Sequence, residues 1–158
     1  MKRRDEASAS YPLGPALDFL QRLWNLNHVL EKISRRMEKR LGSTAQQRLI
    51  LRCIGKYPGM TAGHLAMLLH LDPGTVSAAL NRLETKDLLE RRRDPRDRRR
   101  VTLGLTAKGR ALDRPAPGTV EGAVERLLAS TPAEQLQTMK AIVDQLTWLL
   151  GAELEARG

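Results

Sequence analysis

The sequence has little of three features that whole classes of protein require. Aromatic residues make up 3% of the 158 residues, too few for a surface that stacks on the bases of a single strand. Cys53 is the sole cysteine, so the chain can form no internal disulfide and no cysteine-based zinc site. The chain has neither a signal-peptide pattern nor an apolar run near the roughly 18 residues of a membrane span. We therefore expect a cytoplasmic protein with no membrane partner.

Sets of residues typical of an enzyme or of a cofactor site are also lacking. The sequence has no nucleophile elbow, no glycine loop that cradles phosphate and no metal-ligand grouping of its three histidines. With 41% hydrophobic and 28% charged residues, the composition is that of one ordinary folded domain. We expect a binding protein that is not an enzyme and holds no metal or other cofactor.

Positive charge, by contrast, is abundant and unevenly placed. The net charge is +9, and residues 91–100 alone contain seven arginines and two aspartates. Such an excess indicates a polyanionic partner. An arginine-rich stretch by itself is more often a solvated face, so the elements on either side of it decide what it does.

Capping residues and apolar spacing predict four helices before the arginines. The first helix runs from Pro12 to Leu41 and ends at the cap Gly42. A capping box at 44–47 opens the second helix, whose inner face we expect to carry Leu49, Ile50, Cys53 and Ile54. The third helix begins at the N-cap Thr61, and we expect its core residues to be Leu65, Met67 and Leu68. Asp72 caps the fourth, with Pro73 at its first position and an apolar face of Val76, Leu80 and Leu83.

Beyond residue 86 the spacing is that of strands rather than of a helix. We expect two short strands, 88–92 and 100–105, around a turn that contains Asp94 and Pro95. Alternating apolar residues anchor the second strand: Val101, Leu103 and Leu105. Thr106 caps a following helix, which the stretch 115–118 interrupts. A helix then resumes from about Pro117 to Ala129, and Thr131 caps the last one.

This order of elements predicts a mainly α fold with one small β-hairpin, a winged helix-turn-helix over residues 43–105. A helix fits the major groove of double-stranded DNA, and its N-terminal residues meet bases and phosphates there. Arginines of a neighbouring hairpin suit a narrow minor groove. The DNA-binding residues that we expect on the third and fourth helices are Thr61, His64, Pro73, Gly74, Thr75, Ser77, Ala78, Asn81 and Arg82.

The residues from Asp94 to Gly109 closely resemble the wing signature of the MarR (multiple-antibiotic-resistance regulator) family. Residues 80–91 are similar to the stretch that joins the recognition helix of that family to its wing. The resemblance implies a homodimeric transcription regulator, a repressor that binds a pseudopalindromic operator and responds to a small aromatic or phenolic effector. At the wing tip it implies that Asp97 orients Arg99 into the minor groove, while the DNA backbone is contacted by Arg96 and Arg98.

The remaining segments are assigned in the same way. Residues 1–11 are expected to be a disordered tail, and the resemblance implies dimerisation helices at 12–42 and 106–158. It also implies an effector pocket, for which the candidates are Trp24, Asn27, His28, Arg48 and Cys53. Simple packing is the alternative for Trp24, as it is for Cys53, where thiol sensing is also open. Two features depart from the family pattern: Asp87 replaces a usual glycine, and the break at 115–118 falls within a dimerisation helix.

Three other functions stay open at this point. A winged helix can be a scaffold or nucleoid-type protein with no specific operator, and footprinting of a short palindrome separates this function from a regulator. It can bind RNA, which competition between RNA and double-stranded DNA decides. A small enzyme would be revealed by turnover that a pocket mutation abolishes.

Overall fold

The computed structural model describes residues 13–97 and 99–156, and the tail expected at 1–11 lies outside them, as does Arg98. The chain divides into two compact units, one that ends at Arg114 and one that begins at Pro115.

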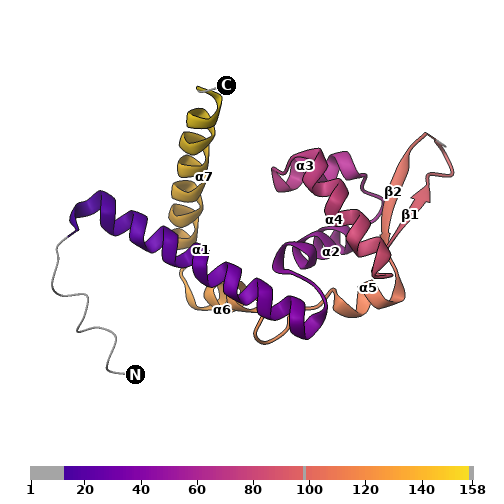
Figure 1. Cartoon of the computed structure of the whole chain (residues 1–158), viewed down its shortest axis with the longest axis horizontal. Coiled ribbons are helices and arrows are strands. Elements are labelled where there is room, and N and C mark those ends of the chain that lie inside the picture. Colours follow the sequence, from indigo (N-terminus) through magenta and orange to yellow (C-terminus); the bar gives the residue numbers. More distant parts are fainter. Residues whose placement is uncertain (1–12, 98, 157–158) are drawn as a thin grey trace. The chain divides into compact units, whose positions relative to one another are not determined.

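Four helices open the first unit (Figure 1): α1 (Gly14–Leu41), α2 (Ala45–Lys56), α3 (Ala62–Leu69) and α4 (Pro73–Thr85). Their starts and stops confirm the predicted caps. Gly42 takes the left-handed conformation after α1, and the capping box of Thr44 and Gln47 forms at the start of α2. Thr61 and Asp72 accept hydrogen bonds from amides in the first turns of α3 and α4.

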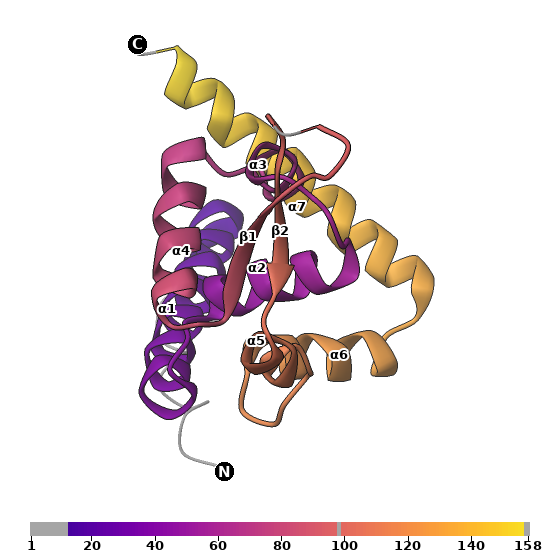
Figure 2. The same ribbon diagram turned by 90° about the vertical axis from the view of Figure 1, so that its right-hand side faces the viewer.

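A β-hairpin follows α4, as predicted, and lies next to that helix (Figure 2). Its antiparallel strands are β1 (Leu89–Arg93) and β2 (Val101–Leu105), paired from Leu89 with Leu105 to Arg93 with Val101. On its other edge β2 is held by the amide of Leu103, which donates to the carbonyl of Met60 at 2.8 Å. The hairpin is thereby fastened to the connection between α2 and α3.

One apolar core joins α2, α3, α4 and the hairpin, and it contains the predicted Ile50, Ile54, Leu65, Val76, Leu80, Leu83, Leu103 and Leu105. Four expected core residues are exposed instead: Leu49, Met67, Leu68 and Val101. Helix geometry explains three of these errors, since residues advance by about 100° each. Leu65, Ala66 and Leu69 share the inner side of α3, so Met67 and Leu68 fall on the outer side, as Leu49 does on α2.

Val101 is exposed for a different reason. It is the first residue of β2, pairs with Arg93 and lies beyond the helices that cover Leu103 and Leu105. Alternation along a strand predicts which side a residue occupies, but only the packed helices decide how far along the strand that side is covered.

After β2, the first unit ends with the short helix α5 (Ala107–Leu112), capped by Thr106 as predicted. The second unit contains α6 (Val120–Ser130) and α7 (Ala133–Glu155). The break at 115–118 is confirmed, but α6 begins three residues after Pro117, because Gly118 has φ +73° and the buried Thr119 caps the helix. The cap predicted at Thr131 is wrong: α7 starts at Ala133, so Thr131 lies one residue too early to cap it.

The two sides of α3 give a first test. We expect Leu65→Ala, which empties a fully buried position, to lower the free energy of unfolding by about 2–5 kcal/mol. The matched variant Leu68→Ala, at a side chain that is 46% exposed, should cost less than about 1 kcal/mol. Urea denaturation measures both values, and equal losses would contradict the described orientation of α3.

Two helical glycines give a second test. A Cβ on Gly109 in α5 would lie 2.0 Å from the carbonyl oxygen of Leu88, whereas a Cβ on Gly63 in α3 would meet nothing closer than 3.9 Å. We expect Gly109→Ala to lower the melting temperature through this backbone clash, despite the better helix propensity of alanine. Gly63→Ala should leave the melting temperature unchanged or raise it. Thermal denaturation followed by circular dichroism decides, and a stabilising Gly109→Ala would contradict the close packing of α5 on the backbone of Leu88.

Candidate nucleic-acid interface

Helix α4 presents one apolar and one small, polar side. Val76, Ala79, Leu80 and Leu83 are buried against the core. The predicted DNA-contacting residues of this helix are exposed: Pro73, Gly74, Ser77, Ala78, Asn81 and Arg82. Because four of these six are glycine, proline, serine or alanine, the helix backbone can approach a groove wall closely. Thr75 differs from them, since it is half-buried and bonded to its cap.

The N-terminus of α4 is closed by its own cap. Oδ1 of Asp72 accepts a hydrogen bond from the amide of Thr75 at 2.9 Å, and the Thr75 hydroxyl donates to Oδ2. These hydrogen bonds from Thr75 hold the pKa of Asp72 below its usual value. The carboxylate of Asp72 therefore stays charged, and it compensates the partial positive charge at the N-terminus of α4.

The start of α3 contributes the other two predicted contacts. Thr61 is half-buried, and its hydroxyl oxygen accepts from the amide of His64 at 3.2 Å. His64 itself is exposed in the first turn of α3. Thr61 therefore shapes the helix start, whereas the His64 side chain is available to a ligand.

Two aspartates shape the loop at the tip of the hairpin. Oδ1 of Asp94 accepts from the amide of Arg96 at 2.9 Å, and Oδ1 of Asp97 accepts from the amide of Arg99 at 3.0 Å. Asp97 was expected to orient the Arg99 side chain, but its hydrogen bond goes to the backbone of Arg99. This Asx-type turn fixes where Arg99 leaves the loop rather than where its guanidinium points.

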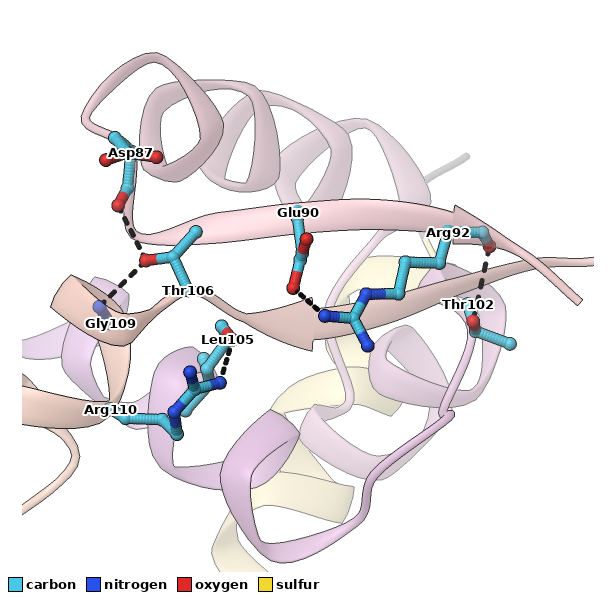
Figure 3. Close-up of polar contacts among 8 residues, drawn as sticks. All are labelled: Asp87, Glu90, Arg92, Thr102, Leu105, Thr106, Gly109 and Arg110. Carbon is cyan, nitrogen blue, oxygen red and sulfur yellow. Dashed lines mark hydrogen bonds and ion pairs between the residues drawn. The ribbon is translucent and has the colours of Figure 1, made fainter.

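Two arginines of β1, Arg91 and Arg92, have partners that the sequence-based hypothesis missed. Arg91 turns toward α4, where its Nη2 donates to Oδ1 of Asn81 at 2.6 Å and its Nε lies 3.3 Å from Oε2 of Glu84. Arg92 turns to the other side of the strand and pairs with Glu90 (Figure 3). Strand alternation was the available signal, since Arg91 shares a side with the buried Leu89.

A left-handed residue joins α4 to the hairpin. Asp87 has φ +57°, which confirms that aspartate takes the conformation for which the family usually has glycine. The Thr106 hydroxyl donates to its carbonyl at 2.7 Å (Figure 3), and Nζ of Lys108 donates to the carbonyl of Lys86 at 2.8 Å. Side chains from the start of α5 thus hold the turn that sets the direction of the hairpin.

The five candidate effector residues lie on two helices. On α1, Trp24 is 68% exposed, Asn27 donates to Glu31, and His28 lines a groove of about 470 Å³ with Lys32, Arg35, Arg36 and Lys39. On α2, Arg48 is buried and donates to the carbonyl of Arg114 at 2.7 Å. The groove at His28 therefore contains neither Arg48 nor Cys53.

Cys53 is half-buried and packs against the apolar core. Burial raises the pKa of its thiol, and this effect outweighs the opposing charges of Lys56 and Arg52. Such a thiol is predominantly protonated at neutral pH, which is unlike the electropositive setting of a reactive cysteine.

Two features are absent from the described part of the chain. Within residues 13–97 and 99–156, no three His, Cys, Asp or Glu side chains come together in a way that could hold a metal ion. Among the helices of these residues, none combines the length and the apolar character needed to cross a membrane.

Comparison with known proteins agrees with this geometry. The sequence model of the MarR family matches residues 43–101. An HTH-type transcriptional repressor of Mycobacterium tuberculosis is 30% identical over 106 residues, which are 67% of this chain and 76% of that protein. The organic hydroperoxide resistance transcriptional regulator of Bacillus subtilis is 31% identical over 105 residues, 65% of this chain and 68% of that one.

A solved structure extends the similarity to the fold. The crystal structure of Streptococcus pneumoniae FabT in complex with DNA matches with a TM-score of 0.64 and 28% identity, and the match covers 87% of this chain and 99% of that one. The capped helix-turn-helix, the arginine-rich hairpin and these matches together show that the chain belongs to the MarR family and is a winged helix-turn-helix transcription regulator.

Proposed function

We propose that the chain acts as a homodimer that represses transcription by binding a pseudopalindromic operator in double-stranded DNA. The observation that carries this proposal is the placement of the exposed, small-residue side of α4 beside an arginine-rich hairpin. In this arrangement α4 enters the major groove, and the hairpin reaches the adjacent minor groove. Arg96 and Arg98 contact the DNA backbone and Arg99 enters the minor groove, while sequence preference comes mainly from α4.

Exposed apolar side chains support the homodimer. Along α1 the exposed residues include Leu17, Phe19, Leu20, Trp24 and Leu26. Helix α7 buries no residue along its 23 residues, although it carries Met139, Ile142, Val143, Trp148, Leu149 and Leu150. Extended apolar surfaces of this kind mark protein contacts. A second copy covers them in a symmetric pair, and two copies of α4 then read half-sites about 10–10.5 bp apart.

We further propose that a small aromatic or phenolic effector releases the operator. Trp24, Asn27 and His28 combine an aromatic surface with polar groups on α1, which is the composition of a site for such a ligand. Arg48 and Cys53 act as packing residues instead, because Arg48 donates to the carbonyl of Arg114 and Cys53 lies against the core.

The salt dependence of DNA binding tests the hairpin. Replacing Arg99 by alanine removes one cation that we place against the DNA, so the slope of log K against log salt concentration should become shallower by about 0.9. Fluorescence anisotropy with an operator duplex at several salt concentrations measures this slope.

The matched control is Lys140→Ala, which removes one exposed charge from α7 and should leave the slope unchanged. Equal slopes for wild type and Arg99→Ala would contradict the assignment of Arg99 to the DNA surface.

The thiol of Cys53 gives a test of the packing role. Because burial raises its pKa, alkylation by iodoacetamide should have a higher pH midpoint in the folded protein than in urea-unfolded protein. At pH 7 the folded protein should react more slowly than the unfolded control. Mass spectrometry follows the reaction, and a folded-state midpoint at or below that of the unfolded chain would instead favour a redox-sensing thiol.

A further inference from the structure

Arg91, the third residue of β1, forms a cluster with the exposed side of α4. Its Nη2 donates to Oδ1 of Asn81 at 2.6 Å, and its Nε lies 3.3 Å from Oε2 of Glu84. Asn81 and Glu84 are three residues apart, so their side chains are neighbours on the helix surface. Ser77, one turn before Asn81, is exposed on the same side. The contact therefore lies on the side of α4 that we place in the major groove.

The contact fixes which way the Asn81 amide points. A guanidinium carries only hydrogen-bond donors, so the amide atom facing Arg91 has to be the oxygen. The Nδ2 group of Asn81, with its two donors, is then turned away from Arg91. An unrestrained asparagine can offer an acceptor and a donor together, as a bidentate contact with adenine requires. The hydrogen bond from Arg91 occupies one of the two lone pairs of Oδ1 and fixes the direction of the amide, so the Asn81 oxygen is less available to the N6 donor of adenine.

Together these two side chains present donors to the groove. Arg91 has five N–H groups, and Asn81 and Glu84 engage one each, which leaves three that neither of these partners takes. The Nδ2 group of Asn81 adds two more donors. Glu84 is a carboxylate beside this cluster, and it repels phosphates, so the cluster suits a base edge better than the DNA backbone.

The major-groove edges of the four bases differ in what they offer to such a cluster. Guanine presents two acceptors, N7 and O6, whereas adenine has a donor at N6 in place of O6, and cytosine presents a donor at N4. We infer that Arg91 and Asn81 form a specificity-determining pair that reads a guanine in each half-site, with Glu84 as the residue that positions Arg91. This inference rests on the proposed operator binding and names one base preference of that site.

Selection from a randomised duplex library, followed by sequencing, tests the inference with the full-length protein. Wild type should show one position in each half-site where guanine is preferred over adenine by about tenfold or more. Arg91→Ala should reduce that preference to within about threefold at this position and leave the rest of the motif unchanged. The variant Asn81→Asp keeps an acceptor for Arg91 but removes the Nδ2 donors, so the preference should move toward adenine or cytosine, which offer donors.

Arg92→Ala is the matched control. It removes the same charge from the next residue of β1, whose side chain pairs with Glu90 on the other side of the strand (Figure 3). We expect this control to keep the guanine preference, and melting temperatures confirm that each variant is folded. A motif unchanged in both Arg91→Ala and Asn81→Asp, or altered equally by Arg92→Ala, would overturn the inference while operator binding stands. A wild-type selection that enriches no motif would contradict the proposed function and the inference with it.

Discussion

The turn at residues 86–88 is the constraint on which the proposed DNA-binding surface depends. The amide of Leu88 donates to the carbonyl of Leu83 at 2.9 Å, which ends α4, and the buried Leu88 side chain then begins the hairpin. The carbonyl of Leu88 accepts from Thr106, and Gly109 packs so closely on it that no side chain fits there. Nζ of Lys86 donates to the carbonyl of Gly42, which ties the same turn to the end of α1. The hydrogen bonds and close packing of this turn therefore fix the direction of the hairpin relative to α4.

Ion pairs and hydrogen bonds hold several of the positively charged side chains of the hairpin in defined positions. Its arginines are not equivalent: Arg91 is bound to α4, Arg92 to Glu90, and Arg100 lies 3.9 Å from Asp94. The two aspartates hold the backbone of the tip, at the amides of Arg96 and Arg99. The two aspartates thus lower the net positive charge of the most basic segment of the chain, and they define the conformation of its loop. In the proposed complex, the remaining cations supply affinity for any DNA, and selectivity requires side chains with fixed orientation.

Local signals in the sequence predicted much of this structure. Thr44, Thr61, Asp72 and Thr106 cap helices as expected, because a cap depends only on residues within one turn. Errors arose where the outcome depends on packing between distant segments. Met67 and Leu68 are apolar but face outward, because only one side of α3 packs against the core. The contact between Arg91 and Asn81 joins residues ten positions apart, so no local pattern predicts it. The described groove at His28 includes neither Arg48 nor Cys53, because a sequence pattern does not specify how two helices meet.

Methylation protection of an operator duplex tests most directly whether the exposed side of α4 enters the major groove. Dimethyl sulfate modifies N7 of guanine, an atom at the major-groove edge, so a bound helix shields it. We expect two groups of protected guanines whose centres are about 10–10.5 bp apart, one for each protomer. Binding that leaves every guanine N7 open to methylation would contradict the placement of α4 and leave only contacts to the DNA backbone.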